Sequence, residues 1–190
     1  MIWVDGVGGY LVCPGPSAWI GRAVFEPRVE IPLVGNLQRR HARLVWQSES
    51  HAVAPANPIW VNGRQVSEPV QLKNGDVLHL ADSVGVRYRQ PLLLGSTACL
   101  DLIRPARTVP WCDGILLMGE TLILGQSPAA HIMCHELSKG LVLVNRQGDL
   151  TVQTSRWIDV DGRRVRGSVR IGLGSRLVCD DVSVTFEAHQ

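Results

Sequence analysis

Lysine, phenylalanine and tyrosine are scarce in this sequence of 190 residues: it has 2 Phe and 2 Tyr, and its lysines are Lys73 and Lys139. The formal net charge is +2, too small to indicate a nucleic acid or an anionic membrane as a partner. A helical stripe of apolar residues is also missing. The 19 Gly and 11 Pro are spread among short Val-rich runs, which is typical of all-β proteins with little or no helix.

Signals for a membrane span or for secretion are missing as well. The longest apolar run, residues 114–125, contains Glu120 and is shorter than the roughly 20 residues that a bilayer span requires. The first residues lack a basic segment followed by an apolar core, so they do not form a signal peptide. The 5 Cys are an odd number without CxxC spacing, which indicates reduced thiols. We therefore expect a cytoplasmic protein that does not engage a membrane.

The most informative stretch runs from residue 20 to residue 42 and carries arginines at both ends. It opens with Ile20-Gly21-Arg22 and closes with residues 37–42, which include Arg39 and His41. Between these ends, residues 29–33 alternate apolar and polar with a β-branched bias, so a strand is expected there. Two arginine-bearing turns at one end of a sheet are placed to converge on one anion.

Further along the first half, short apolar runs alternate with turn residues. Strands are expected at residues 43–47, 51–54, 59–61 and 84–89. Asn62-Gly63 is the strongest hairpin signal in the sequence, because both residue types tolerate positive φ. These elements predict a β-sandwich built from hairpins.

Four stretches of the first half recur in the second half in the same order. The pairs are 3–6 with 111–114, 20–22 with 124–126, 61–66 with 160–165, and 72–78 with 171–177, at separations of 108, 104, 99 and 99 residues. Because the separations only shrink, the sequence indicates a duplicated unit whose second copy is shorter. We expect two tandem β-sandwich units, a first at 1–92 and a degenerate second at 111–190, joined by an ordered connector at 93–110.

The first copy resembles the forkhead-associated (FHA) domain, a β-sandwich that binds phosphothreonine peptides through loops at one end. The resemblance rests on Gly21-Arg22, Arg39, His41-Ala42, Asn57, Asn62-Gly63, Leu72 and Gly75-Asp76, in the order and spacing of the family between residues 19 and 88. No one of these motifs is specific, whereas the ordered set is. The fold that it implies agrees with the all-β composition.

The resemblance implies a role for each matching residue. Arg22 matches the arginine that contacts the phosphate, Arg39 offers a second donor, and Asn57 matches the asparagine that hydrogen-bonds the peptide backbone. Gly21, His41, Asn62 and Gly63 are expected to support the binding loops. These roles suit the chemistry, because a phosphate carries nearly two charges and three acceptor oxygens and needs a fixed guanidinium with further donors.

The first copy departs from the family pattern at three places. Gln38 replaces a phosphate-binding serine but still offers an amide donor. Ala56 stands where a hydroxyl residue is common. Pro58 and Ile59 replace the usual Gly-Thr, which stiffens that loop and removes a backbone donor. A hydrogen bond to a charged group contributes about 1.5 to 3 kcal/mol, so these changes are expected to weaken binding.

The second copy keeps the hairpin at Asp161-Gly162 but has Gln126 in place of the key arginine. Residues 129–131 keep the histidine of the second turn and neither of its arginines. The fold signal therefore survives while the charge for holding a phosphate does not. We expect this unit to be structural or to serve as a protein-docking surface.

No motif indicates catalysis: GxSxG, HExxH and the P-loop are absent. His131, Cys134 and His135 lie close in sequence, but on a strand Cys134 would face away from both histidines. A zinc hydrolase or redox protein using this cluster is an alternative from the enzyme class.

The sequence thus predicts a non-enzymatic adaptor, without cofactor, metal or nucleic acid, that binds a phosphothreonine segment of a Ser/Thr kinase or its substrate through Arg22, Gln38, Arg39 and Asn57. The main alternative is a phosphate-independent interaction scaffold with a vestigial pocket.

Overall fold

The computed structural model describes residues 1–24, 29–82 and 84–188, and in these residues it contains strands and no helix. The strands are β1 (Ile2–Val4), β2 (Gly8–Pro14), β3 (Ser17–Arg22), β4 (Ile31–Leu33), β5 (Ala42–Gln47), β6 (Ser50–Pro55), β7 (Ile59–Val61), β8 (Arg64–Val66), β9 (Val70–Gln71), β10 (Val77–Ala81), β11 (Val84–Arg89), β12 (Ala98–Ile103), β13 (Gly114–Met118), β14 (Thr121–Gly125), β15 (Ile132–Met133), β16 (Leu141–Arg146), β17 (Asp149–Val160), β18 (Arg163–Ile171), β19 (Arg176–Cys179) and β20 (Val182–Phe186). The all-β prediction is confirmed. None of the described segments forms a helix of the length and hydrophobicity that crossing a bilayer requires.

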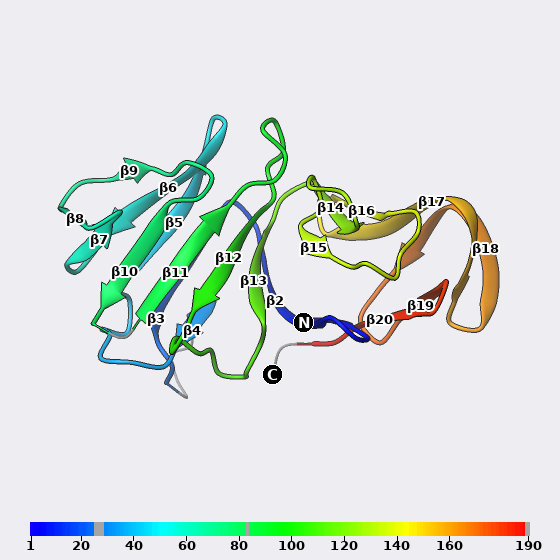
Figure 1. Ribbon diagram of the computed structural model, residues 1–190, viewed down its shortest axis with the longest axis horizontal. Helices are drawn as coiled ribbons and strands as arrows, with labels where there is room; N and C mark the ends of the chain where they lie inside the picture. The colour runs from blue at the N-terminus through cyan, green and yellow to red at the C-terminus, as the bar shows by residue number, and fades with distance from the viewer. Residues whose placement is uncertain (25–28, 83, 189–190) are drawn as a thin grey trace.

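Two sheets make up the described part of the chain. A five-stranded sheet has the order β4-β3-β5-β6-β9, and a fifteen-stranded sheet runs β15-β14-β16-β17-β19-β20-β1-β2-β13-β12-β11-β10-β7-β8, with β18 paired to β17. The long sheet passes through the whole molecule from one end to the other (Figure 1). Both halves of the chain are therefore connected by backbone hydrogen bonds and not by a flexible tether.

A first hydrophobic core lies between the five-stranded sheet and one half of the long sheet. Ile20, Leu44, Leu78 and Leu100 are fully buried in it. Leu44 and Leu78 each have an exposed neighbour on their strand, as the period of two in a strand predicts, whereas Leu100 has the buried Cys99 beside it. Strands β3 and β4 lie at the lower side of this sandwich in Figure 1.

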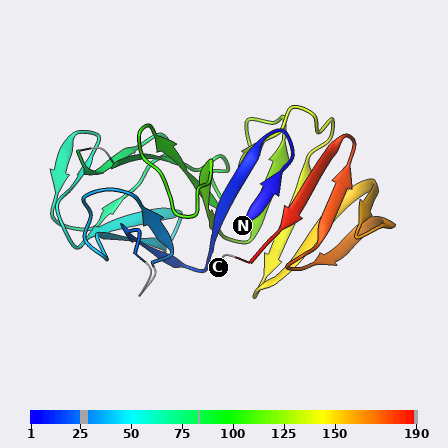
Figure 2. The same cartoon turned by 90° about the horizontal axis from the view of Figure 1, so that it is seen from below.

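A second core is formed by the other half of the long sheet, and the first strand of the chain takes part in it. Ile2 and Val4 pack there with Phe186, because β1 pairs antiparallel with β20. Figure 2 shows the blue N-terminal hairpin beside the red β20. The unit boundaries at 1–92, 93–110 and 111–190 stay a prediction. Strand β1 packs into the second core, whereas β12 places Ala98 and Leu100 in the first core and Cys99 in the second.

The parallel pair β2–β13 joins the two cores. Leu11 pairs with Ile115 and Val12 with Leu116. Leu11 and Ile115 belong to the first core, whereas Leu116 belongs to the second and Val12 packs against it. Both faces of β13 are buried, which explains why residues 114–118 form an apolar run without alternation.

Two buried histidines are expected to make the stability of the fold depend on pH. Nδ1 of His51 lies 3.1 Å from the Tyr88 hydroxyl, which donates to Oε1 of Gln90, and His131 is fully buried. Burial lowers the pKa of His51 to about 4, and burial together with the charge of Arg89 lowers the pKa of His131 to about 4. The neutral rings are thus the native forms.

We expect the free energy of unfolding to fall as the pH drops from about 6.5 to about 4. In this window the unfolded chain binds protons at both histidines and the native chain does not, so stability rises with pH by up to about 1.4 kcal/mol per unit for each histidine. Urea unfolding between pH 7 and pH 4.5 measures this slope. His51→Phe should make the slope of stability against pH shallower, whereas the exposed His135→Gln should leave it unchanged. Equal slopes in the wild type and both variants would contradict a lowered pKa for His51.

Candidate functional site

Backbone hydrogen bonds tie together three segments at one end of the first sandwich: the end of β3, the loop before β5, and the β6–β7 turn. The Arg22 amide donates to the Gln38 carbonyl at 2.9 Å, and the His41 amide donates to the Ile20 carbonyl at 2.8 Å. The Asn57 amide in turn donates to the His41 carbonyl at 3.0 Å. The two arginine-bearing turns seen in the sequence are therefore adjacent, and the Asn57 turn is attached to the second of them.

Gly21 allows the first two segments to approach so closely. A Cβ atom on Gly21 would lie 1.8 Å from the carbonyl oxygen of Arg39 and 2.6 Å from its carbonyl carbon. Both contacts are with backbone, which cannot rotate away as a flexible side chain can. The glycine next to Arg22 is thus required by the path of the Gln38–Arg39 backbone.

His41 is a brace behind these loops. Its ring is buried, with Nδ1 3.3 Å from the Gln38 amide and Nε2 3.1 Å from the Pro58 carbonyl. Because a backbone N–H only donates, Nδ1 must accept, which assigns the proton to Nε2 and makes it the donor to Pro58. The neutral ring therefore links the second and third segments, with Pro58 as an acceptor.

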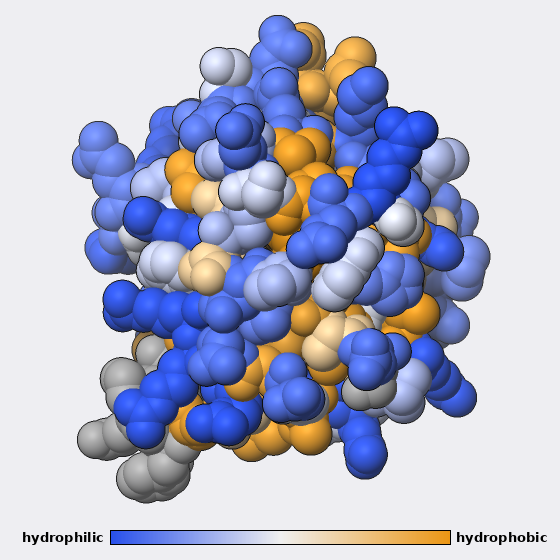
Figure 3. All heavy atoms as spheres, turned by 90° about the vertical axis from the view of Figure 1, so that its left-hand side faces the viewer, coloured by the Kyte–Doolittle hydropathy of each residue, from blue (hydrophilic) through white to orange (hydrophobic). Residues whose placement is uncertain are grey.

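The side chains of Arg22, Gln38 and Arg39 are exposed at this end. The ion pairs formed within the described residues involve Arg89, Arg156 and Arg170, so neither Arg22 nor Arg39 is neutralised by a described carboxylate. The carboxylate of Glu30 accepts the Trp19 amide at 2.8 Å, and Glu26 lies outside the described residues. Figure 3 faces the left-hand side of the molecule in Figure 1, the side of β7 and β8, where hydrophilic side chains lie around smaller apolar patches.

Asn57 is half-buried and partly engaged with its surroundings. Its Nδ2 donates to the Arg40 carbonyl at 3.2 Å, a bond that fixes the amide beside the arginine loop. The structure thus brings together Arg22, Gln38, Arg39 and Asn57, with Gly21 and His41 beneath them.

Asn62 and Gly63 lie at the other end of β7 and do not touch these loops. Their φ angles of 50° and 78° are those of the expected two-residue hairpin turn. Asn62 bonds Asp76 through Nδ2 at 2.8 Å and accepts the Val77 amide at 2.9 Å. These residues brace the turn before β10 and so support the sandwich, not the binding loops directly.

Arg40 and Trp19 belong to this surface, although the sequence pattern did not single them out. The Arg40 guanidinium lies 5.3 Å from the centre of the Trp19 ring and that of Arg43 lies 5.7 Å from it. Cation–π contacts of this kind hold a cation in place without neutralising it. Trp19 and Arg43 are direct partners in the register of β3 and β5. Knowledge of this register would have indicated the contact between Trp19 and Arg43.

The loop around Ala130 and His131 is closed by a side chain from β11. Arg89 on β11 donates to the Ala130 carbonyl at 3.2 Å and to the His131 carbonyl at 2.9 Å, while pairing with Asp101. Ala130 and His131 are fully buried. This loop is therefore an internal contact and not an open site.

The possible metal cluster near His131 gains no support. Nδ1 of His131 accepts the Ile123 amide at 3.0 Å, and His135 is exposed whereas Cys134 is buried. The described residues contain no group of three His, Cys, Asp or Glu side chains placed to hold a metal ion. All 5 cysteines are buried and free, and burial raises the pKa of Cys13 and Cys99 to about 12.

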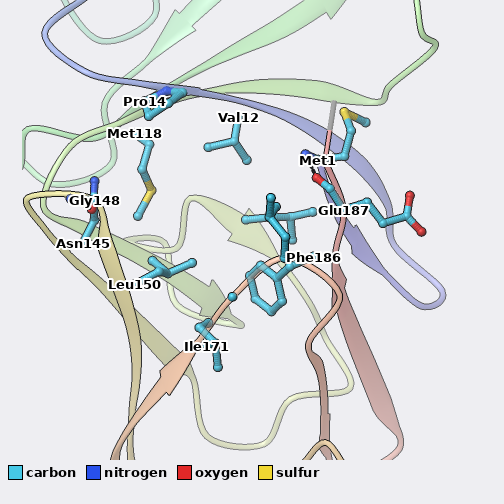
Figure 4. A pocket seen from close by; sticks show the side chains of 13 residues that line it. Met1, Val12, Pro14, Met118, Asn145, Gly148, Leu150, Ile171, Phe186 and Glu187 are labelled. Carbon is cyan, nitrogen blue, oxygen red and sulfur yellow. Dashed lines mark hydrogen bonds between the residues drawn. The ribbon is translucent and has the colours of Figure 1, made fainter. Parts of the chain in front are cut away.

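A separate hollow of about 250 Å³ opens at the mouth of the second core (Figure 4). Met118, Leu150, Ile171 and Phe186 point into it, and its lining contains no Lys or Arg side chain. Its chemistry does not suit a phosphate, so it is distinct from the site in the first sandwich.

Comparison with known proteins agrees with the geometry. The FHA domain family matches residues 18–81, a segment that begins in β3, ends in β10 and contains the loops that carry Arg22, Arg39 and Asn57. No curated protein and no solved structure matches the chain. Residues 18–81 thus form an FHA domain, and FHA domains are interaction modules that bind phosphorylated protein segments.

Proposed function

We propose that the first unit binds a phosphothreonine segment of a partner protein through Arg22, Gln38, Arg39 and Asn57. The observation that carries this proposal is the hydrogen-bonded junction of the Arg22 and Arg39 turns, whose guanidinium groups have no described carboxylate partner. A doubly charged phosphate beside two such guanidiniums would form charge-assisted hydrogen bonds. The function is that of an adaptor and not of an enzyme.

Each residue has a distinct part in this binding. Arg22 and Arg39 neutralise the phosphate, the Gln38 amide supplies a neutral donor, and Asn57 bonds the peptide backbone next to the phosphothreonine. The backbone carbonyl of Gln38 already accepts from Arg22 and its backbone N–H already donates to His41, which leaves the side-chain amide for the phosphate. The loops are therefore fixed before the ligand binds. Little conformational entropy is then lost on binding.

The proposed context is cytoplasmic signalling, with a Ser/Thr kinase or its substrate as partner. The main alternative remains a phosphate-independent scaffold, favoured by the departures from the family pattern at Gln38, Ala56 and Pro58. Pro58, however, supplies the carbonyl that accepts from His41 at 3.1 Å. The substituted loop is therefore built into the site.

Arg22→Ala should weaken binding of a phosphothreonine peptide at least tenfold. Losing a hydrogen bond to a charged group costs about 1.5 to 3 kcal/mol, and about 1.4 kcal/mol corresponds to a factor of ten. Fluorescence anisotropy with a phosphothreonine peptide library and its unphosphorylated twins measures the effect. The matched control is Arg87→Ala, an exposed arginine on β11, which should bind as the wild type does. Equal affinity for both peptide forms would favour the scaffold.

We further propose that the second unit is a degenerate copy of the first, as the sequence repeats predict. Backbone conformation supports this: residues 99 positions apart share positive φ, with Ser48 and Gln147 at 58° and 55°, and Gly75 and Gly174 at 95° and 85°. Asn62 accepts the Val77 amide as Asp161 accepts the Arg176 amide, again 99 residues on. In the β2–β13 pair each residue faces the one 104 positions later.

In this proposal the two copies exchange their first strands. The strand that precedes β2 is β1, which pairs with β20 of the second copy, and the strand that precedes β13 is β12, which pairs with β11 of the first copy. Strand β1 thus completes the sandwich of the second copy, and β12 completes that of the first. The second copy is then a structural partner that holds the FHA domain in place.

The hollow of the second core fits the same proposal. By the 99-residue separation, Asn145 and Leu150 stand where the first copy has Trp46 and His51, whose rings pack edge to face with centroids 5.1 Å apart. Smaller side chains in the second copy leave this space open. The hollow is thus accounted for by lost aromatic packing.

A further inference from the structure

Strand β18 is a long open edge of the second unit. It spans nine residues and, within the described part of the chain, pairs with β17 alone. It lies at the outer rim of the molecule, orange in Figures 1 and 2. In the first unit the same region is divided into the three-residue β8 and the two-residue β9, which belong to different sheets. The second unit therefore offers a longer edge of free backbone N–H and C=O groups, with a break in regular strand geometry at Gly167, whose φ is 96°.

The side chains of this edge carry one sign of charge. Within its nine residues β18 has four exposed arginines, at positions 163, 164, 166 and 170, and no acidic residue. Val165 and Val169 pack against the second core, so Arg164, Arg166 and Arg170 project from the opposite face by the period of two in a strand. Arg170 pairs with Asp149, whereas no ion pair to a described carboxylate engages Arg164 or Arg166.

A tryptophan borders the arginines on the neighbouring strand. Trp157 of β17 is 55% exposed, and the Arg164 guanidinium lies 5.4 Å from the centre of its ring. The ring therefore holds Arg164 in place at the surface. An aromatic and arginines together at an open edge form a surface suited to recognition.

The charge selects among the possible occupants. A second copy of β18 would set arginine against arginine, which is destabilising across paired strands. A nucleic acid would meet the arginines but would leave the backbone groups of the edge unused. An extended segment with Glu or Asp at alternate positions would use both the arginines and the free backbone groups of the edge. Its backbone would extend the sheet, and its carboxylates would pair with the guanidiniums.

We propose that β18 binds an extended acidic segment of a partner protein by strand addition, with carboxylates facing Arg164 and Arg166. This interaction is separate from phosphopeptide binding by the first unit. The interaction should weaken with salt, since both charged partners are exposed. Hydrogen bonds along the edge set the register of the segment.

The test uses a labelled eight-residue peptide of alternating Glu and Thr, measured by fluorescence anisotropy with the full chain, and a Lys–Thr twin. Two further versions carry N-methyl groups on the odd or on the even amides. Strand addition requires that one methylated version loses binding and the other keeps it, because only alternate amides of an edge strand face its neighbour. Arg164→Gln with Arg166→Gln should weaken binding of the parent peptide at least tenfold.

Matched controls separate this surface from the rest of the chain. Arg87→Gln with Arg104→Gln removes the same charge from exposed arginines elsewhere and should leave binding unchanged, as should Arg22→Ala. The proposal is overturned if the acidic peptide does not bind up to about 1 mM, or if both methylated versions bind like the parent. It is equally overturned if oligothymidylate binds more tightly than the peptide and displaces it.

Discussion

Gly21→Ala is expected to abolish phosphopeptide binding and to lower the free energy of unfolding by about 2 to 4 kcal/mol. The added methyl would lie 1.8 Å from the Arg39 carbonyl oxygen, so the backbone of the second turn has to move. That movement breaks the bond between the Arg22 amide and the Gln38 carbonyl and separates the two guanidiniums. The measurements are urea unfolding and anisotropy with a phosphothreonine peptide.

The same substitution at Gly172 is the matched control. A Cβ atom there meets nothing within 4 Å, and its φ is not in the left-handed region, so Gly172→Ala should leave both stability and binding unchanged. If Gly21→Ala behaves like this control, the two turns are not in the contact described here. The comparison isolates the close approach of two backbones from any general effect of replacing glycine.

Val4→Asp is expected to destabilise the second core by about 3 kcal/mol or more, although residue 4 is far in sequence from most residues of that core. Val4 is 3% exposed, belongs to the second core and pairs with Val184. A carboxylate buried there has no cation to pair with among the apolar side chains of that core. Hydrogen–deuterium exchange should show faster exchange in β19 and β20 than in β5 and β6.

The control for this change is Val109→Asp at a valine that is 53% exposed. It adds the same charge without burying it and should leave exchange unaltered. Faster exchange confined to β3 and β5 in Val4→Asp would contradict the proposed exchange of first strands. Because the readout is resolved by strand, a general loss of stability does not mimic the expected result.

Local turn chemistry made several strands predictable. Asn57-Pro58 and Asn62-Gly63 enclose a strand expected at 59–61, which is β7 (Ile59–Val61), and the alternation at 84–89 gives β11 (Val84–Arg89). In both cases the residues that end the strand act over two or three positions. The strand expected at 29–33 is shorter in the structure, where β4 spans Ile31–Leu33, since its extent depends on pairing with β3.

The sequence predicted which residues belong to the candidate site, but it did not predict how they contact one another. The order of Gly21, Arg22, Arg39, His41 and Asn57 along the chain identified the loops, and the FHA domain at residues 18–81 agrees with it. The contacts between these residues were not predictable, because the Gly21–Arg39 approach joins a residue of β3 to one in the loop before β5. Asn62 and Gly63 were expected beside the loops, yet their partners are Asp76 and Val77, at the opposite end of β7.

By itself, the sequence determined that the chain is all-β, where its tight turns fall, and which arginines stand at loop ends, because these follow from local conformational preferences and a period of two. Only the tertiary structure decided that β1 lies beside β20 and that the Ala130–His131 loop is closed by Arg89. The physical reason is that an apolar strand is complementary to many sheet edges. Its partner is selected by the packing of the complete cores, which no stretch of sequence contains alone.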